Sequence, residues 1–426
     1  MIFRPKIIFL IFMIALSGKC LPQDNWVRQN SPVSSALFNC FFTDSLNGWA
    51  AGEEGVIIHT SDGGVNWVIQ NNPVNYYIND IFFLNKNTGW CVSNEFLLDG
   101  TTILKTTNGG NVWNAEPFPD STVFFRTIYF LDSLKGYLAG FFGAISKTTD
   151  GGNSWFSAFV DTSVYSDYPI NRIKFLNAQT GFACGGIIDI AGVIWKSTDS
   201  GNNWTAADYA AEPFYDISLK NQNRLFIIGG DFEYGAQFVS SADQGSVWNY
   251  NQLGFFGQGQ SLAYRTESEM WMALGFSGAW AFSSDSGNTW ITIPVTDNAA
   301  VNSVKFTDSL HGWAVGNYGA ILKYVPKLVG ISQNTDHIPE KFSLSQNYPN
   351  PFNPKTQISF TIKDSGPAKL IVYDILGNEA SSLVNEFLTA GSYTVSFDGN
   401  NFPSGVYFYK LTSGEFSETK RMVILK

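Results

Sequence analysis

The chain has few of the residues that build metal centres and catalytic triads. Its 426 residues include four cysteines and three histidines. The histidines, His59, His311 and His337, belong to no metal-binding or triad-like motif, and no cysteine spacing resembles a metal site. We therefore expect no cofactor and no bound metal. Cys91 and Cys184 fall where other copies of an internal repeat carry alanine, so we interpret them as small buried residues.

Basic residues are also scarce over most of the chain. Residues 21–326 contain 14 Lys and Arg against 27 Asp and Glu, a net charge of −13, whereas residues 340–426 contain eight of each. Nucleic acids and anionic lipids both require basic patches on a protein that binds them. We therefore expect no nucleic-acid partner.

Long apolar runs are absent as well. The longest near the N-terminus, Ile7–Leu16, has ten residues, and a helix that spans a bilayer needs about 20. It follows Arg4 and Lys6 and precedes small residues, which is the order of a secretory signal peptide. We assign residues 1–20 to a signal peptide and expect no transmembrane segment in the mature protein.

One short pattern is present six times along the chain. The copies are TSDGGVNW (Thr60–Trp67), TTNGGNVW (Thr106–Trp113), TTDGGNSW (Thr148–Trp155), STDSGNNW (Ser197–Trp204), SADQGSVW (Ser241–Trp248) and SSDSGNTW (Ser283–Trp290). Successive tryptophans are 46, 42, 49, 44 and 42 residues apart. A period of about 40–50 residues, with strand-like segments between the copies, predicts a β-propeller.

The two ends of the repeat complement each other. We call this eight-residue pattern the box. The last copy of the longer repeat runs through Asn317–Tyr324 and has no box after it. Asp24–Trp26, in contrast, resembles the end of a box and lies one period before Trp67. We therefore predict an all-β fold in which residues 21–326 form a seven-bladed β-propeller. The N-terminal strand closes the last blade beside the strand that ends near Tyr324, because a closed ring exposes no strand edges.

Each box is expected to be the hairpin between the third and fourth strands of a blade. Its glycines supply the positive φ of a tight turn, and its Asp or Asn accepts hydrogen bonds from turn amides. These residues are Asp62, Asn108, Asp150, Asp199, Asp243 and Asp285. Because the boxes lie at one radius, their side chains diverge, and we predict a structural role for them.

The pattern S/T-x-D-x-G-x-x-W resembles the Asp-box (BNR) repeat. With the preceding D-S-x-x-G-W-A-x-G segments, residues 24–326 are most similar to the propellers related to the photosystem II assembly factor. Sialidases also carry Asp boxes, but they need three arginines that clamp a carboxylate. The five arginines of this region include none in the Arg-Ile-Pro context of that family, which argues against a sialidase.

The C-terminal region follows a different pattern. Residues 327–339 show no repeat and are predicted to be a linker. In residues 340–426, apolar residues alternate at period two between turns, which predicts a small antiparallel β-sandwich of Ig-like type.

This region closely resembles the type A sorting domain of type IX secretion. The motifs that carry the resemblance are YPNPFNP, VYDILGNE, AGSYTVSFDG, SGVYFYKL and the terminal KRMVILK. The resemblance implies recognition by the type IX secretion machinery and passage through the periplasm and the outer membrane. The protein would then be secreted, or held on the outer-membrane surface, in a Bacteroidetes-like bacterium.

The loops between the second and third strands share the face opposite the boxes. They contain acidic and aromatic residues and no Lys or Arg. The residues we expect to contact a ligand are Glu53, Glu54, Glu95, Asp99, Asp231, Glu233, Tyr234 and Tyr318. The same loops also hold Asp189, Phe141, Phe142 and Phe276.

These features predict a secreted or cell-surface binding or scaffold propeller that is not an enzyme and whose ligand is an extracellular protein or glycan. The alternative is a glycoside hydrolase, which would need a convergent pair of carboxylates. Glu53 or Glu54 with Asp231 or Glu233 is the candidate pair.

Overall fold

The computed structural model describes residues 25–94, 100–220, 223–325, 332–334, 339–364, 366–388, 390–400 and 402–426. The chain divides into two compact units, Met1–Val325 and Pro326–Lys426. The predicted signal peptide and the loop residues Glu95 and Asp99 lie outside the described residues. Among the helices of the described residues, none is long and apolar enough to cross a membrane.

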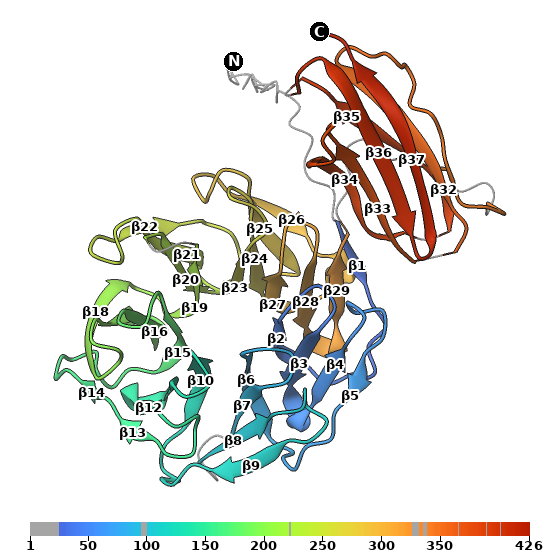
Figure 1. Cartoon of the computed structure of the whole chain (residues 1–426). Coiled ribbons are helices and arrows are strands. Elements are labelled where there is room, and N and C mark those ends of the chain that lie inside the picture. The colour runs from blue at the N-terminus through green and yellow to red at the C-terminus, as the bar shows by residue number, and fades with distance from the viewer. Residues whose placement is uncertain are drawn as a thin grey trace, which may run out of the picture. The chain divides into compact units, whose positions relative to one another are not determined.

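In the described part of the first unit, the strands form seven sheets arranged as a ring (Figure 1). Sheets 1 to 3 are β2(Leu37–Phe42)-β3(Gly48–Gly52)-β4(Ile57–Thr60)-β5(Val68–Ile69), β6(Tyr77–Phe83)-β7(Gly89–Asn94)-β8(Thr101–Thr106)-β9(Asn114–Pro117) and β10(Phe125–Phe130)-β11(Gly136–Gly140)-β12(Ile145–Thr148)-β13(Phe156–Ser157). Sheets 4 and 5 are β15(Ile170–Phe175)-β16(Gly181–Ile187)-β17(Ala191–Ser197)-β18(Asn203–Ala210)-β14(Phe159–Val160) and β19(Phe214–Leu219)-β20(Leu225–Asp231)-β21(Gly235–Ser241)-β22(Asn249–Gln252). Sheets 6 and 7 are β23(Gln258–Tyr264)-β24(Met270–Gly275)-β25(Ala279–Ser283)-β26(Ile291–Pro294) and β27(Val301–Phe306)-β28(Gly312–Gly316)-β29(Ile321–Tyr324)-β1(Trp26–Arg28).

Sheet 7 joins the two ends of the repeat, as predicted. Strand β1 pairs antiparallel with β29, with Trp26 opposite Tyr324 and Arg28 opposite Leu322. The Trp26 side chain is buried and stacks on Trp280 of the preceding sheet at 4.9 Å between ring centroids. The N-terminal strand therefore supplies both an outer strand and part of the core between sheets 6 and 7.

Sheet 4 has an extra strand that the sequence did not predict. After β13 the chain leaves sheet 3, and β14 pairs in parallel with β18, with Phe159 opposite Asn203. This excursion accounts for the longest spacing of the repeat, the 49 residues between Trp155 and Trp204.

Aromatic side chains fill the seams between neighbouring sheets. Trp49 of β3 stacks on Phe83 of the next sheet at 3.6 Å, and Phe83 meets the box residue Trp113 edge-on at 5.8 Å. The Trp49 indole also donates to the carbonyl of Gly109 in that box, at 3.1 Å. A Cβ on Gly48 would overlap the ring of Phe42, which explains the glycine before this aromatic position.

The six boxes share one set of hydrogen bonds. In the first box, Thr60 Oγ1 donates to Asp62 Oδ1 at 2.8 Å and accepts from the Gly64 amide at 2.8 Å. The Asn66 amide donates to Asp62 Oδ1 at 2.9 Å. Equivalent bonds to the box Asp or Asn are present at Asn108, Asp150, Asp199, Asp243 and Asp285. The turn hydrogen bonds expected from the sequence are therefore present.

The second unit contains two four-stranded sheets in its described residues. Their orders are β30(Ser332–Asn334)-β35(Gly391–Asp398)-β32(Lys355–Ile362)-β31(Ser343–Leu344) and β34(Glu379–Leu388)-β33(Gly366–Tyr373)-β36(Gly405–Ser413)-β37(Phe416–Ile424). Buried residues of both sheets, such as Phe360 and Tyr409, belong to one hydrophobic cluster. Within the segment 327–339 that we expected to be a linker, Ser332–Asn334 form a strand that pairs with β35.

Candidate functional site

The propeller presents two different faces. The third strand of sheets 1 to 6 runs from a loop to a box, as β4 does between the turn η1(Glu53–Gly55) and the box residue Thr60. We call the ends with the second-to-third-strand loops the loop face and the opposite ends the box face. Turns η2(Phe141–Gly143) and η4(Asn317–Gly319) belong to the loop face.

A β-bulge recurs in the first strand of every sheet, close to the loop face. In sheet 1 the pairing skips one residue between Leu37 and Asn39, beside Gly52 at the end of β3. The seven skipped residues are Phe38, Asn79, Arg126, Asn171, Tyr215, Gln260 and Asn302. Together with Tyr77 and Arg172 they line one central pocket of about 300 Å³. A bulge re-aims side chains, and here seven bulges aim at the centre of the ring.

The residue after each bulge joins a set of buried polar contacts that we call the inner belt. Its members are Asn39, Asp80, Thr127, Arg172, Asp216, Ser261 and Ser303. Arg172 Nη1 donates to Asp80 Oδ1 at 2.8 Å, and its Nε lies 3.5 Å from Asp216 Oδ1. One arginine of sheet 4 thus bridges carboxylates of sheets 2 and 5.

Hydroxyl and amide groups complete the inner belt around the ring. Ser261 Oγ donates to Asp216 Oδ2 at 3.4 Å and accepts from the Val304 amide at 3.2 Å. The next side chain along, Ser303, donates to Asn39 Oδ1 at 2.9 Å, and Asn39 in turn donates to Asp80. The inner belt therefore links all seven sheets by side chains, in addition to the backbone pairing of β1 with β29.

Burial and neighbouring charges shift the pKa values of groups in and beside the inner belt in opposite directions. Burial raises the pKa of Asp216, but the charges of Lys174, Lys305 and Arg172 lower that pKa more, so the carboxylate stays ionised. Burial lowers the pKa of Arg172, and Asp80 and Asp216 raise it more. Burial lowers the pKa of Lys174 to about 8, although its Nζ lies 3.1 Å from Asp216.

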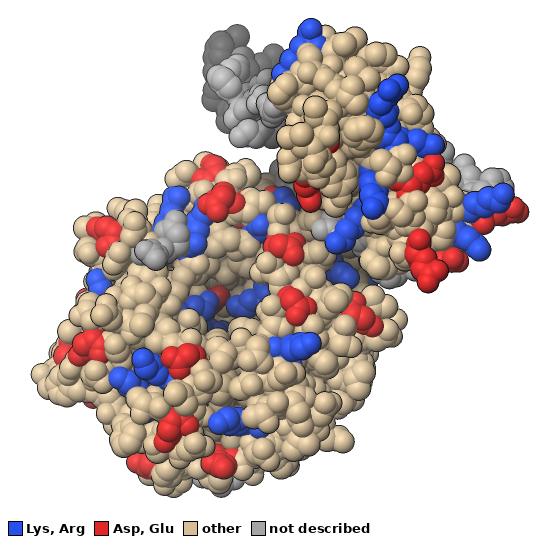
Figure 2. All heavy atoms as spheres, viewed as in Figure 1, with Lys and Arg blue, Asp and Glu red and all other residues tan. Residues whose placement is uncertain are grey.

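Arg126 differs from Arg172 because no carboxylate pairs with it among the described residues. Its Nη1 donates to Asn171 Oδ1 at 2.7 Å, and its guanidinium lies 5.0 Å from the centroid of the Phe141 ring. Burial and the nearby charge of Arg172 both lower the pKa of Arg126. Figure 2 shows basic side chains in the hollow at the centre of the ring. The central pocket can therefore accept an anionic group.

Two of the sequence-predicted residues, Glu53 and Glu54, lie in turn η1 and hold the segment that leads into β2. Glu53 accepts from the Ala36 amide at 3.2 Å, and Glu54 accepts from Ser35 Oγ at 2.6 Å. Both carboxylates are thus engaged within their own sheet.

Asp231 is buried at the end of β20, where it shapes the following turn. Its Oδ1 accepts from the amides of Glu233 and Tyr234, at 3.0 and 2.6 Å. The expectation of a ligand-facing Asp231 does not match this burial, whereas Glu233 and Tyr234 are exposed on the loop face. Tyr318 is also exposed, in turn η4 with a left-handed backbone.

The structure brings Asp231 close to two further carboxylates. Oxygens of Asp189, Glu212 and Asp231 all lie within 4.8 Å of one another. Burial, and then the charges of Asp231, Asp189 and Glu233, raise the pKa of Glu212. No sequence pattern points to Glu212, which precedes β19 and lies outside the boxes and the second-to-third-strand loops. Carboxylates gather in proteins without an ion, so this cluster alone assigns no metal.

The predicted carboxylate pair for hydrolysis is divided between distant sheets. Glu53 and Glu54 belong to sheet 1, whereas Asp231 and Glu233 belong to sheet 5, and the ring places other sheets between them on both sides (Figure 1). Among the described residues, the lining of the central pocket includes no Asp or Glu. The residues that do line it offer polar and cationic groups for binding.

Comparisons with known families agree with this architecture. Residues 346–425 match the model of the secretion system C-terminal sorting domain, and residues 19–118 and 246–325 match that of the photosynthesis system II assembly factor YCF48. The chain is therefore a β-propeller of BNR type followed by a sorting domain. More narrowly, the propeller is YCF48-like, and the C-terminal match indicates a Bacteroidetes-type secreted or surface protein exported by type IX secretion.

Individual relatives share the propeller. The photosystem II assembly lipoprotein Ycf48 of Synechococcus sp. (strain CC9902) is 22% identical over 286 residues, which are 56% of this chain and 83% of the relative. The solved structure of YCF48 bound to D1 peptide is 23% identical with a TM-score of 0.59 and covers 72% of this chain and 98% of its own. A GH74 enzyme of Niastella koreensis is 12% identical with a TM-score of 0.57 and covers 93% of this chain and 74% of its own.

Proposed function

We propose that this protein is a non-catalytic scaffold propeller that binds a polypeptide segment on its loop face, outside the cell. The observation that carries the proposal is Arg126, a partly buried cation without a carboxylate partner in the described part of the chain, in a pocket that every sheet lines. A carboxylate of the ligand would supply the missing anion, since pairing offsets the cost of burying a charge.

Other features of the central pocket support a peptide ligand. Nδ2 of Asn79 has no hydrogen-bond acceptor in the described structure and lies at the pocket wall, where a peptide carbonyl can accept from it. The solved structure of YCF48 with a D1 peptide is a precedent for peptide binding by such a propeller. The exposed loop residues Glu233, Tyr234 and Tyr318 would contact the ligand around the pocket, and Glu95 and Asp99 are proposed to do so from their loop.

The proposal includes a closed ring of seven blades and a C-terminal Ig-like sandwich that serves as the export address. The seven sheets and the pairing of β1 with β29 support the ring. Residues 1–20 would direct the chain to the periplasm, and the sorting domain would direct it onward to the secretion machinery. A periplasmic reporter fused to residues 326–426 should reach the cell surface in a host with type IX secretion, as judged by protease shaving of intact cells.

The experiment that tests the binding function uses the full chain on an array of acidic and neutral peptides. Arg126→Gln should abolish most of the binding to acidic peptides, whereas Arg28→Gln, which removes the same charge from an exposed position of β1, should leave it unchanged. Equal binding by wild type and Arg126→Gln, with both folded, would show that the central pocket is not the binding site.

The second candidate is a glycoside hydrolase, favoured by the fold similarity to the GH74 enzyme. It would require Glu53 or Glu54 to act with Asp231 or Glu233. A hydrolysis screen with soluble polysaccharides should detect no product above a Glu53→Gln/Glu233→Gln control. Turnover that the double variant abolishes would favour the enzyme.

A further inference from the structure

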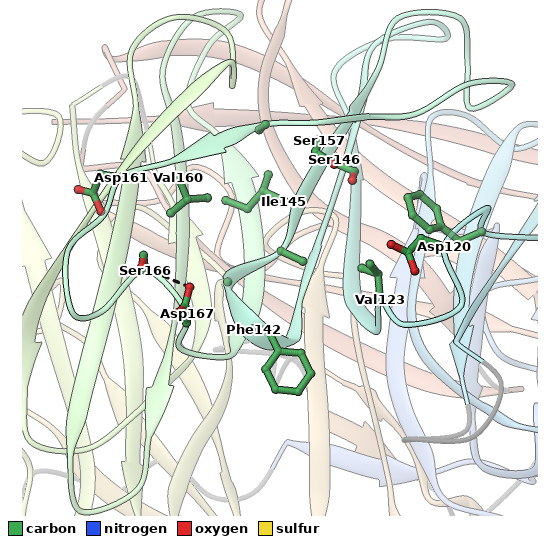
Figure 3. A pocket seen from close by; sticks show the side chains of 14 residues that line it. Asp120, Val123, Phe142, Ile145, Ser146, Ser157, Val160, Asp161, Ser166 and Asp167 are labelled. Carbon is green, nitrogen blue, oxygen red and sulfur yellow. Dashed lines mark hydrogen bonds between the residues drawn. The ribbon is translucent and has the colours of Figure 1, made fainter.

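Phe118, the residue after β9, lines two pockets beside sheet 3. The first has a volume of about 240 Å³, and Figure 3 shows the carboxylates of Asp120, Asp161 and Asp167 around it. None of the buried polar atoms that lack a hydrogen-bond partner in the described residues belongs to its lining. This first pocket therefore gives no indication of a ligand.

We call the second pocket the seam pocket, because residues of sheets 2 and 3 line it. Its volume is about 370 Å³, within the range of about 300–1,000 Å³ of pockets that enclose small ligands. Strands β8 and β9 contribute from sheet 2, and the box residues Gly152–Trp155 contribute from sheet 3. The seam pocket shares no lining residue with the central pocket, so it is a separate candidate site.

Two indole N–H groups of the seam pocket have no acceptor among the described residues. They belong to Trp90 of β7, which is fully buried, and to the box residue Trp155. Between sheets 1 and 2 the equivalent of Trp90 is bonded, because Trp49 Nε1 donates to the Gly109 carbonyl at 3.1 Å. A buried donor without an acceptor is unfavourable, so both indoles of the seam pocket would gain from a ligand oxygen.

Between sheets 1 and 2, a side chain of the protein occupies the place equivalent to the seam pocket. Gln70, three residues after the box residue Trp67, accepts with its Oε1 from Trp113 Nε1 at 3.1 Å. Its Nε2 donates to the Gly109 carbonyl at 2.7 Å. A Cβ on Gly110 would overlap the Gln70 carboxamide. An amide is thus a group that fits between a box tryptophan and the preceding sheet.

The chain places no such amide in the seam pocket. Glu116 lies three residues after Trp113, at the position equivalent to Gln70, and it lines the pocket. It is exposed, and its carboxylate forms no ion pair within the described residues. A carboxylate cannot reproduce the two roles of Gln70, because an ionised carboxylate accepts hydrogen bonds and donates none.

The space beside Gly152 is open. A Cβ on this glycine would lie 3.5 Å from Trp155 Cζ2 and 3.7 Å from Trp90 Nε1, and no described atom outside the adjacent residues would be closer. In the other five boxes, a Cβ on the corresponding glycine would come within 3.0 Å of a side-chain atom. Of the six boxes, the one in sheet 3 therefore leaves room for an atom of a ligand beside its indoles.

The other groups of the seam pocket suit a neutral ligand with both polar and apolar parts. Lys105 Nζ donates to the Gly151 carbonyl at 2.8 Å, and the Glu116 carboxylate also lines the pocket, so both signs of charge are present. Phe118 and Pro119 add apolar surface. An acetamido group on a sugar has an acceptor oxygen, an N–H donor and a methyl group, and the sugar ring occupies the volume beyond the amide.

We propose that the seam pocket binds an N-acetylated sugar unit of a glycan through its acetamido group. The carbonyl oxygen accepts from the indole N–H groups of Trp90 and Trp155, in the place that Gln70 Oε1 takes between sheets 1 and 2. The amide N–H donates to Glu116, and the apolar face of the sugar ring packs on Phe118. The site is independent of the proposed function, which places a carboxylate at Arg126.

The test compares two disaccharides on the full chain by isothermal titration calorimetry. The probe is N,N′-diacetylchitobiose, and the matched control is cellobiose, which has the same linkage and carries hydroxyl groups in place of the acetamido groups. We expect the acetylated disaccharide to bind at least about tenfold more tightly, because buried donors gain an acceptor. In NMR spectra, the indole N–H signals of Trp90 and Trp155 should move on binding.

Trp155→Phe removes one donor and keeps an aromatic ring, so it should weaken binding of the acetylated disaccharide about tenfold. Trp290→Phe is the matched control. It removes the indole at the same box position of sheet 6, where the Gly287 carbonyl already accepts from that indole at 3.1 Å. The affinity of this control should equal that of wild type.

Glu116→Gln keeps the test decisive if Trp155→Phe folds poorly. The new carboxamide should fill the seam pocket as that of Gln70 fills its own seam. The variant should therefore melt at the same temperature as wild type or higher, and bind the acetylated disaccharide about tenfold more weakly.

Equal binding of the two disaccharides would overturn the proposal. So would an equal loss of affinity in Trp155→Phe and Trp290→Phe, or unchanged affinity in Glu116→Gln. N-acetylglutamine amide offers the same chemistry from a polypeptide, and it should bind more weakly than the acetylated disaccharide. If it binds as tightly, the pocket recognises a peptide side chain and the assignment to a sugar is wrong.

Discussion

The box face and the loop face are made by the same seven sheets of the described propeller, but they differ in how strictly they repeat. On the box face, six turns share one hydrogen-bond pattern centred on residues such as Asp62 and Asp150. On the loop face, turns of the same length differ in residue type, from η1 with two glutamates to η2 with two phenylalanines.

This contrast distinguishes the side chains that the fold needs from those that are available to bind a ligand. A box side chain whose bonds recur in six of the sheets satisfies the backbone of its own turn, so the ring needs it for folding. Arg126 in the central pocket has no such recurring bonds, lies near the loop face, and departs from the repeat because the equivalent positions of other sheets carry other residue types. We therefore expect ligand binding at positions where the residue type differs from sheet to sheet.

The largest expected effect is a difference in the free energy of unfolding between variants of the two arginines of the central pocket. Arg172→Ala leaves Asp80 and Asp216 buried without their bridging cation, and should lower the free energy of unfolding by about 3–5 kcal/mol. Arg126→Gln should change it by less than about 0.5 kcal/mol, because no carboxylate depends on it in the described residues. Urea unfolding of both variants checks this, and similar losses would show that Arg126 also belongs to the framework.

The next effect concerns ring closure. Trp26→Ala removes a buried side chain that stacks on Trp280, and should cost about 3 kcal/mol of unfolding free energy. Val27→Ala is the matched control, since Val27 is exposed on the same strand. If differential scanning calorimetry shows equal melting temperatures for the two variants, β1 does not close the ring.

Much of this framework could be predicted from the sequence. The boxes, the four-stranded repeat and the pairing of β1 with β29 follow from the tryptophan spacing and from the unmatched ends. The central pocket could not be predicted, because a bulge moves one residue per strand and these residues share no chemistry, as Phe38, Arg126 and Gln260 show. The acidic loops were visible, but burial of Asp231 in its own turn was not.

A smaller effect tests the box face. Asp62→Ala removes the acceptor for the Asn66 amide and should cost about 1 kcal/mol of unfolding free energy. Asp62→Asn should cost less, because the second box works with Asn108 at the same position. Peptide binding should be unchanged in both variants. A variant of normal stability that loses binding would place recognition on the box face.

The smallest effect is the response of the boxes to acid. Hydrogen bonds from Ser154 lower the pKa of Asp150 to about 2, and bonds from Asn203 do the same for Asp199, from an ordinary value of 3.8. Because the folded pKa lies below the unfolded one, the stabilisation is complete above about pH 4 and is lost as the pH falls toward 2. Asp150→Asn cannot titrate, so its stability should fall less than that of wild type between about pH 5 and pH 2.5. Urea unfolding at each pH measures this. If the free energy of unfolding changes equally with pH in wild type and Asp150→Asn, this carboxylate has no such role.

The most direct test of the difference between the faces is hydrogen exchange of the full chain, with and without the peptide that binds most tightly on the array. We predict slower exchange at the starts of the first strands, around Arg126 and Asn171, and in turns η2 and η4. Amides of the boxes, such as those of Gly64 and Asn66, should exchange at the same rate in both states. Protection confined to the boxes, with no change around Arg126, would contradict it.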